Sequence, residues 1–135
     1  MRFLLDTNIC IHLLKAYPPR VIERFKTTPL GDVAMSVVTY AELHHGIERT
    51  PAEDRAAADH ALQRFIARVP VLPFDESAAK CYGVLAAAVR DRRRDTMDRL
   101  IAAHALSIGV TLVTNNEADF SAYPGLAVEN WARGA

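Results

Sequence analysis

The sequence predicts an α/β fold, with a central, mainly parallel sheet of four to five strands and helices on both of its faces. Short apolar segments of strand length alternate along the chain with longer segments of helical periodicity. No repeat or linker interrupts this alternation. The chain has 135 residues, of which 50% are hydrophobic, so it is long enough for one domain with its own core and too short for two. We therefore expect a single domain over residues 1–135.

The first half of the chain is expected to contribute two strands and four helices. The strands are predicted at residues 2–5 and 33–38, and the helices carry apolar side chains within residues 9–14, 21–25, 40–47 and 62–66. Pro18 and Pro19 separate the first two helices, because proline lacks an amide hydrogen and restricts the residue before it. Pro19 also suits the first turn of the second helix.

Two threonine motifs predict where the next two helices begin. Thr39 and Glu42 have the spacing of a capping box, in which the two side chains each bond a free backbone amide at the helix start. Thr50 and Glu53 repeat this spacing, with Pro51 in the first helical position. The third helix is therefore expected to start at Thr39 and the fourth at Thr50.

The second half of the chain is expected to complete the sheet. Strands are predicted at residues 69–74, 110–114 and 126–130, and helices at residues 75–89 and 96–108, separated by a charged run at 90–95. Prolines interrupt the first of these strands, which favours a place near an edge of the sheet. Asp75 and Ser77 can cap the first helix, and Gly109 ends the second.

The charge and the cysteine content exclude several classes of protein. The chain has 16 basic and 16 acidic residues, so any contact with nucleic acid must come from a local patch. Cys10 and Cys81 lie in apolar, helix-like segments, unlike the disulfide framework of a small secreted protein. The sequence shows no leader-like or membrane-spanning apolar stretch. A soluble, cytoplasmic protein is expected.

Oxygen-bearing side chains follow the predicted strands at one edge of the sheet. Asp6 comes directly after the first strand, and Glu42 lies in the first turn of the helix after the second. Asn116 and Asp119 follow the fourth strand, while Asp98 lies in the first turn of the helix that precedes it. Ligands of parallel α/β sheets bind beyond the carboxyl ends of the strands. We therefore expect these side chains to gather in one site.

Most of these acids also have a purely structural explanation. Glu42 can serve only its capping box, Asp98 can be an anion favoured by the helix dipole, and Asp119 can cap a turn. Asp6 is different, because a carboxylate directly after a buried strand needs donors or a cation to offset its desolvation. For Asp6 a functional role is favoured, and for the others the residues alone leave both explanations open.

A divalent cation would resolve the repulsion within such an acidic cluster. Oxygen ligands suit Mg²⁺, with Mn²⁺ as the alternative, and Mg²⁺ keeps several waters while bonding one or two carboxylates directly. Other catalytic sites are not indicated. The five histidines lack the spacing of a helical zinc site and are expected to be ordinary helix residues. Neither a glycine-rich phosphate loop nor a G-x-S-x-G motif is present.

Four blocks of the sequence, in order, resemble one family. They are "LLDTNICI", "SVVTYAELHHGIER", "DRLIAAHAL" and "LVTNNEADF", and they span nearly the whole chain. Together they are similar to PIN-domain ribonuclease toxins of the VapC type, from VapBC toxin–antitoxin systems. The resemblance implies a three-layer α/β/α PIN-like fold and a Mg²⁺-dependent endoribonuclease that hydrolyses RNA phosphodiester bonds. It also implies a VapB-like antitoxin as partner and a homodimer.

The resemblance assigns roles to the acids as well. The residues it implies as catalytic are Asp6, Glu42, Asp98 and Asp119, and those implied around the metal are the same four and Asn116. Family members often carry an aspartate where this chain has Asn116, an uncharged oxygen ligand. Asp119 is therefore expected to substitute for that missing charge.

Two further groups of side chains have an open interpretation. Thr7, Ser36 and Thr114 can orient the carboxylates through hydrogen bonds, or can serve only as caps. A basic cluster can grip the RNA backbone, or can be a solvated helix end. Its members are Arg90, Arg92, Arg93, Arg94 and Arg99.

Three functions from other classes match parts of the sequence. One is a catalytically silent binding module with the same fold, and another is a metal-dependent phosphatase. The third is a phosphoacceptor receiver domain, which gathers acids at the same edge of a parallel sheet. A receiver would need a lysine after the last strand, and the lysines are Lys15, Lys26 and Lys80. The receiver is therefore disfavoured.

Overall fold

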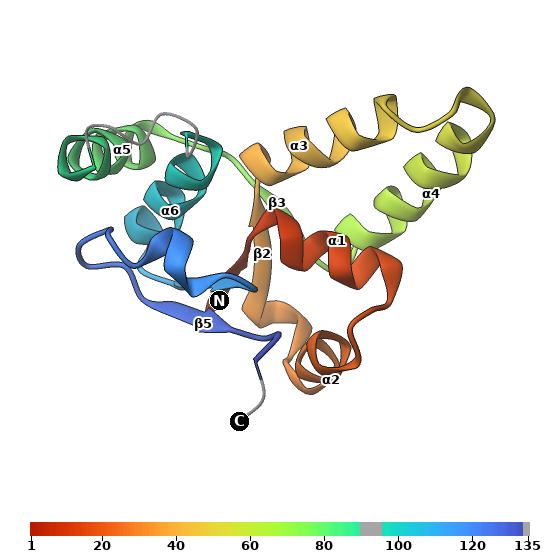
Figure 1. Cartoon of the computed structure of the whole chain (residues 1–135), viewed down its shortest axis with the longest axis horizontal. Helices are drawn as coiled ribbons and strands as arrows, with labels where there is room; N and C mark the ends of the chain where they lie inside the picture. Colours follow the sequence, from red (N-terminus) through yellow and green to blue (C-terminus); the bar gives the residue numbers. More distant parts are fainter. Residues whose placement is uncertain (90–95, 134–135) are drawn as a thin grey trace.

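The computed structural model describes residues 1–89 and 96–133, which form one parallel sheet between two layers of helices (Figure 1). The strands are β1 (Phe3–Leu5), β2 (Val33–Ser36), β3 (Val71–Leu72), β4 (Thr111–Thr114) and β5 (Val128–Asn130). The sheet has five strands in the order β3-β2-β1-β4-β5, and all four neighbouring pairs are parallel. The α/β class and the edge position of the strand after residue 69 are confirmed.

Apolar side chains on both faces of the short strands explain the three layers. Phe3 and Leu5 point into one core and Leu4 into the other, because successive side chains of a strand alternate. The first core is covered by α1 (Thr7–Lys15), α2 (Pro19–Thr27), α3 (Val37–Glu48) and α4 (Arg55–Ile66). The second is covered by α5 (Glu76–Ala88) and α6 (Thr96–Ile108). Figure 1 shows α3 and α4 as a helical pair that extends from the body.

The second strand ends earlier than predicted, and the third helix starts earlier. The strand stops at Ser36, whose Oγ accepts a hydrogen bond from the Val38 amide at 3.1 Å and so caps α3. Val37 and Val38 are typical strand residues, but this cap places them in the first helical turn. Thr39 is therefore inside the helix and not its cap, so that prediction is wrong.

The predicted capping box at Thr50 is also wrong. The Thr50 hydroxyl donates to the Gly46 carbonyl at 3.0 Å, at the end of the preceding helix. The Arg55 guanidinium donates to the Thr50 and Glu48 carbonyls, each at 2.9 Å. A short 3₁₀ turn over Ala52–Asp54 then leads into α4. The local motif is used to close one helix and not to open the next.

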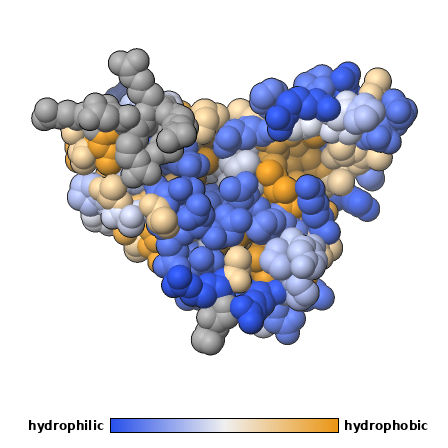
Figure 2. Space-filling model, viewed as in Figure 1, coloured by the Kyte–Doolittle hydropathy of each residue, from blue (hydrophilic) through white to orange (hydrophobic). Residues whose placement is uncertain are grey.

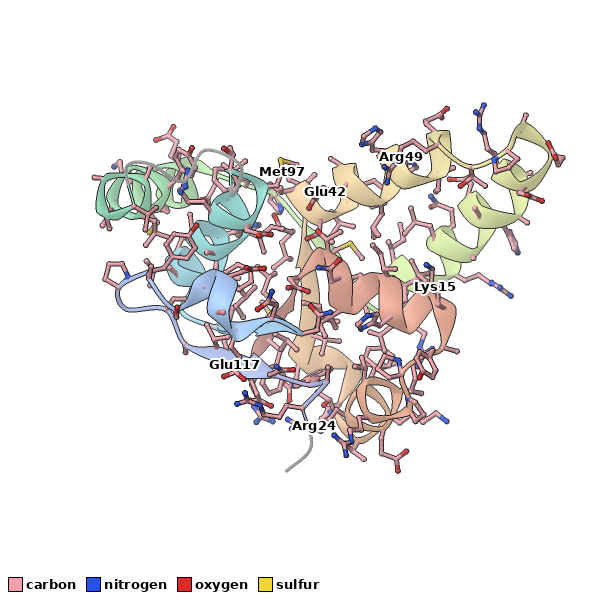
Figure 3. All side chains as sticks on the ribbon, viewed as in Figure 1. Lys15, Arg24, Glu42, Arg49, Met97 and Glu117 are labelled. Atoms are coloured by element: carbon pink, nitrogen blue, oxygen red, sulfur yellow. The ribbon has the colours of Figure 1, made fainter. Side chains whose placement is uncertain are left out.

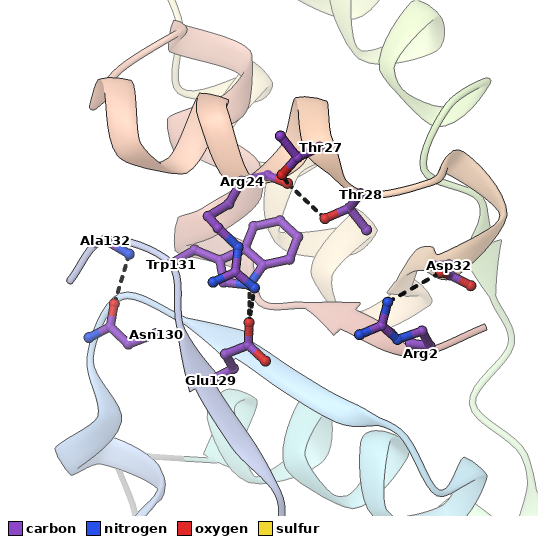
Figure 4. Close-up of polar contacts among 9 residues, drawn as sticks. All are labelled: Arg2, Arg24, Thr27, Thr28, Asp32, Glu129, Asn130, Trp131 and Ala132. Atoms are coloured by element: carbon purple, nitrogen blue, oxygen red, sulfur yellow. Dashed lines mark hydrogen bonds and ion pairs between the residues drawn. The ribbon is translucent and has the colours of Figure 1, made fainter. Parts of the chain in front are cut away.

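The segment after β5 is fixed against the first core by a stacked set of side chains (Figure 4). The Trp131 side chain is fully buried and packs edge-on against Phe3, with ring centroids 5.5 Å apart. The Arg24 guanidinium lies over the Trp131 ring and forms an ion pair with Glu129. Trp131 Nε1 also donates to Glu129 Oε1 at 3.0 Å. Arg24 of α2 thereby fixes β5 and the residue that follows it at this edge of the sheet.

The strand order reverses at the centre of the sheet. The chain passes from β1 outward to β2 and β3, and then returns to place β4 on the other side of β1. Such a switch point leaves a crevice beyond the carboxyl ends of the two strands, here after Leu5 and Thr114. No helix in the described ranges is long and apolar enough to cross a membrane.

Two glycines provide a test of the backbone. Gly109 ends α6 with φ of +69°, so alanine there should lower the free energy of unfolding by about 1 kcal/mol. Gly83 lies inside α5 with open space around its Cα, so alanine there should raise it by about 0.5–1 kcal/mol. Urea unfolding of both variants measures the two effects. Equal shifts of the same sign would contradict the assigned backbone conformations.

Candidate functional site

Asp6 lies at the carboxyl end of β1 and has only 4% of its surface exposed. It caps α1, and its Oδ1 accepts a hydrogen bond from the Ile9 amide at 2.9 Å. The Thr114 side chain, at the end of β4, bonds the same carboxylate. The carboxylate is thus held at the switch point by donors from both sides, which offset part of its desolvation.

The surroundings of Asp6 favour its protonated form. Desolvation by burial raises the pKa of Asp6 from 3.8 to about 6, although the hydrogen bonds from Thr114 and Ile9 oppose the rise. The negative charges of Asp98 and Glu42 make a smaller contribution to the same rise. The structure therefore brings Glu42 and Asp98 within electrostatic range of Asp6, and these three are among the four acids that the sequence placed at this edge.

Glu42 lies in the second turn of α3 and does not cap that helix. Its Oε1 accepts a hydrogen bond from Thr7 Oγ1 at 2.5 Å. Thr7 Oγ1 also lies 3.3 Å from the hydroxyl of Thr39, which is fully buried. The first residue of α1, directly after Asp6, thus orients the glutamate that α3 supplies. The structural explanation of Glu42 as a capping residue is wrong.

Asp98 is half-buried in the first turn of α6. Figure 3 shows the start of α6, marked by Met97, beside the part of α3 marked by Glu42, and the two helices are in contact. The charge of Asp98 acts on Asp6. The acids therefore come from three separate elements, the end of β1, α3 and α6.

The residues after β4 lie at the same edge of the sheet. Asn116 is exposed, and its amide donates to Thr114 Oγ1 at 3.0 Å. Asp119 is half-buried in a 3₁₀ helix, Glu117–Phe120, and its amide donates to the Asn116 carbonyl at 3.3 Å. Asp98 and Glu42 are the acids whose charges raise the pKa of Asp6. The roles implied for Asn116 and Asp119 stay predictions.

Asn115 is a residue that sequence reasoning missed. It directly follows Thr114, and its Oδ1 is buried without a hydrogen-bond partner among the residues described. A buried oxygen of this kind is costly unless a water or an ion binds it. The doubled asparagine in "VTNN", at the end of a central strand, is the signal that indicates it.

The donor set fits a hydrated Mg²⁺ better than a closed metal site. Within residues 1–89 and 96–133, no three His, Cys, Asp or Glu side chains converge closely enough to hold an ion by themselves. Mg²⁺ requires only one or two direct carboxylates and retains its waters. Asp6, desolvated and repelled by two acids, and Asn115, with its unpartnered oxygen, supply the negative charge and the water acceptor that such an ion uses.

The other reactive side chains offer no competing site in the described part of the chain. Both cysteines are free, as expected, and no histidine joins a metal-binding group there. Burial, and then the charge of Asp6, raise the pKa of the Cys10 thiol well above its ordinary value. Cys10 is therefore not an available nucleophile.

The predicted basic cluster is only partly accounted for. Arg90, Arg92, Arg93 and Arg94 lie outside the described residues. Arg99 is buried, with 6% of its surface exposed, and interacts with Tyr82 and Tyr123. Arg99 is thus packed against these tyrosines, so neither open interpretation of the cluster, an RNA grip or a solvated helix end, holds for Arg99.

A groove of about 460 Å³ adjoins the acids. It lies between α1, α3 and α4, and Ile11, Leu43 and Leu62 give it an apolar lining. Glu42 also lines it, so the groove reaches the acidic site. Figure 2 shows apolar side chains in the hollow beside the α3–α4 pair, and Figure 3 shows Lys15 and Arg49 near it.

Comparisons with known proteins identify the family of the chain. The PIN domain family matches residues 3–126. The tRNA(fMet)-specific endonuclease VapC of Shigella flexneri is 37% identical over 134 residues, which cover 98% of this chain and 99% of that protein. Ribonuclease VapC2 of Haemophilus influenzae is 32% identical over 133 residues, covering 97% of this chain and 98% of the relative.

Solved structures share the same fold. VapBC-1 from nontypeable Haemophilus influenzae superposes with a TM-score of 0.86 at 32% identity, covering 98% of this chain and 100% of the other. DNA-bound VapBC from Salmonella typhimurium superposes with a TM-score of 0.85 at 35% identity, covering 97% and 98%. The chain therefore belongs to the PIN-domain family and, within it, to the VapC ribonuclease toxins of type II toxin–antitoxin systems.

Proposed function

We propose that this chain is a Mg²⁺-dependent endoribonuclease that hydrolyses a phosphodiester bond of transfer RNA. The observation that carries the proposal is the buried Asp6 carboxylate, raised in pKa by its own burial and by Asp98 and Glu42, at the switch point of the sheet. Acids held in this conflict favour the uptake of a cation. Mn²⁺ can replace Mg²⁺ in such a site because it accepts the same oxygen ligands.

Each side chain has a definite task in this proposal. Asp6 and Asp98 would hold the ion directly or through water, and Glu42, which Thr7 orients, would position the attacking water. When bound, Mg²⁺ activates water and stabilises the charge that develops on the phosphate. Thr114 keeps Asp6 in place. The water attacks in line with the leaving oxygen, which leaves 5′-phosphate and 3′-hydroxyl ends.

Asn116 and Asp119 complete the site on the β4 side. Asn116 is exposed at the edge of the sheet, where an uncharged oxygen can accept a hydrogen bond from bound water. Asp119 lies in the short helix that follows and supplies the charge that Asn116 lacks. Asn115 offers a third oxygen next to them.

Transfer RNA is the proposed substrate because the VapC proteins of Shigella flexneri and Salmonella typhimurium, 37% and 35% identical to this chain, are named as tRNA(fMet)-specific endonucleases. A chain without net charge cannot bind RNA through its overall field, so recognition must depend on local shape and contacts around the site. A cytoplasmic location is part of the proposal and fits the two free cysteines.

A VapB-type antitoxin is the proposed partner, with its inhibitory segment in the groove between α1, α3 and α4. The groove has a mainly apolar lining that includes Glu42, so an amphipathic segment can bury its apolar side chains there while a basic side chain reaches the acids. A cation from the antitoxin would relieve the repulsion around Asp6 and would occupy the site at the same time.

A homodimer is also proposed. Val84 on α5 is 62% exposed, and Met97 and Ile108 on α6 are 39% and 38% exposed, which leaves apolar surface on this pair of helices. Light scattering of the purified chain measures its oligomeric state, and a monomer at all concentrations would contradict this part of the proposal.

The activity itself is tested with matched substitutions. Asp6→Asn and Asp98→Asn should each lower cleavage of initiator tRNA by about 10²–10³-fold, because each removes a charge that holds the ion or stabilises the transition state. Asp59→Asn, at an exposed position of α4, should leave the rate unchanged.

Sequencing of RNA ends after induction in cells identifies the cleaved bond. End profiles that do not differ between the wild type and Asp6→Asn would favour a silent binding module, and cleavage of small phosphomonoesters alone would favour a phosphatase.

The pKa of Asp6 predicts how stability without metal depends on pH. Because its pKa in the folded chain, about 6, is above the ordinary 3.8, the contribution of Asp6 to stability is greatest below pH 4 and falls as the pH rises through 6. The full loss is about 3 kcal/mol. Asp6→Asn keeps an acceptor for the Ile9 amide but does not titrate. The variant should therefore gain stability over the wild type between pH 4 and 7, and Mg²⁺ should reduce that gain. Urea unfolding across this pH range measures the free energy of unfolding of both proteins. A difference between Asp6→Asn and the wild type that does not change with pH would contradict this prediction.

The groove is tested with two neighbouring alanines of α4. Ala58 lines the groove, whereas Ala57 is exposed outside it. Ala58→Trp should weaken binding of the antitoxin that co-purifies with the wild-type chain by tenfold or more, because the indole fills the space of the inhibitory segment. Ala57→Trp should bind it normally, and both variants should cleave RNA. Equal binding by both variants would show that the antitoxin lies elsewhere.

A further inference from the structure

His104 makes a buried contact between the two helices that carry acids. It lies in α6, six residues after Asp98, and only 2% of its surface is exposed. Its Nδ1 is 2.8 Å from Ser36 Oγ, and Ser36 is fully buried. Sequence reasoning expected His104 to be an ordinary helix residue. A buried hydrogen bond between residues 68 positions apart in the chain indicates a more specific task.

Ser36 is the point at which this bond affects the site. It is the last residue of β2 and the cap of α3, and the same Oγ accepts the Val38 amide at 3.1 Å. One oxygen therefore joins the carboxyl end of β2, the first turn of α3 and the middle of α6. Thr7 and Thr114 contact the acids of the site, whereas the Ser36 hydroxyl contacts His104.

The elements joined at Ser36 supply two of the three acids. α3 carries Glu42 and the buried Thr39, which both contact Thr7, and α6 carries Asp98 in its first turn. A shift of the start of α3 relative to α6 would move Glu42 relative to Asp98. Both charges act on Asp6, so such a shift would change the electrostatic balance of the whole site.

The surroundings of the imidazole favour its neutral form. Burial lowers the pKa of His104, and the nearby charge of Asp75 only partly opposes this. The ring packs edge-on against Phe74, with centroids 5.6 Å apart and planes at 81°, which restricts its rotation. A neutral imidazole offers one donor and one acceptor, so it can bond Ser36 without adding a positive charge beside the acids.

We propose that His104 is a positioning residue: its hydrogen bond with Ser36 fixes α3 against α6 and thereby sets the separation of Glu42 and Asp98 around Asp6. The inference rests on the proposed ribonuclease function for its effect on rate, but the link between the helices is independent of it. If His104 only filled space in the core, an apolar side chain of the same volume would serve equally well, and the hydrogen bond of its Nδ1 would not matter.

The test compares variants that keep the volume with variants that keep the bond. His104→Leu removes the polar atom at nearly constant size, and Ser36→Ala removes the partner. His104→Leu should lower kcat by about tenfold, which corresponds to one buried hydrogen bond, and Ser36→Ala by at least as much because it also removes the cap of α3. KM for RNA should change less than twofold in both. The double variant should be no worse than Ser36→Ala alone, because the bond that His104→Leu removes is already lost there. His104→Asn, which keeps a polar atom near the place of Nδ1, should recover part of kcat.

A stability control separates positioning from loss of packing. Leu85→Ala, in the core between α5 and the sheet, should lower the melting temperature at least as much as His104→Leu but leave kcat unchanged well below that temperature. If kcat fell in proportion to stability in all variants, or if His104→Leu kept full kcat, the proposal would be overturned.

A second measurement does not depend on catalysis. Hydrogen exchange of the Val38 amide, followed by NMR, reports the order of the first turn of α3, and it should be several-fold faster in His104→Leu than in the wild type. An unchanged exchange rate would overturn the proposal whatever the activity. Failure of the wild type to cleave RNA would instead refute the proposed function, and the exchange experiment would still decide whether His104 holds the helices together.

Discussion

The structure depends on the burial of one carboxylate at the centre of its sheet. Asp6 follows three buried residues of β1, and the chain gives it two hydrogen-bond donors but also two acidic neighbours. The donors lower the cost of desolvation, whereas the neighbours increase the cost of charge. A purely structural site would favour a neutral residue at this position. The repulsion between these carboxylates is the physical reason to expect a bound cation. The same cation would then be in place to act on a substrate.

The α/β fold places these acids near one another through the starts of its helices and through side-chain hydrogen bonds. Each acid stands at or near the start of a helix, after a strand or a crossover, and hydroxyls from neighbouring elements orient two of the three, Asp6 and Glu42. Thr114 holds Asp6 from β4, and Thr7 holds Glu42 from α1. Each contact thus joins two elements, so the geometry of the site and the packing of the helices are determined together. The link between His104 and Ser36 extends the same design to α6.

Much of this was predictable from the sequence, because it follows from patterns that are local. Alternating apolar segments gave the class and the parallel sheet, and the position of Asp6 after a buried strand indicated the site. The errors arose where a different contact, either local or tertiary, overrides the motif that the sequence shows. Thr39 and Thr50 match capping boxes, but Ser36 caps the third helix and the Thr50 hydroxyl bonds the helix before it. Arg99 follows a basic run in sequence but is buried between helices. No periodicity reveals such partners.

We infer that Asp6 is buried beside like charges until a cation binds, and the protonation of its carboxyl group reports whether this is so. NMR titration of the Asp6 side-chain carbon, with and without Mg²⁺, measures that pKa. We expect a pKa of about 6 without metal and a clear fall toward or below 3.8 when Mg²⁺ is present. An ordinary pKa in the metal-free chain, or a raised pKa that Mg²⁺ does not change, would contradict it.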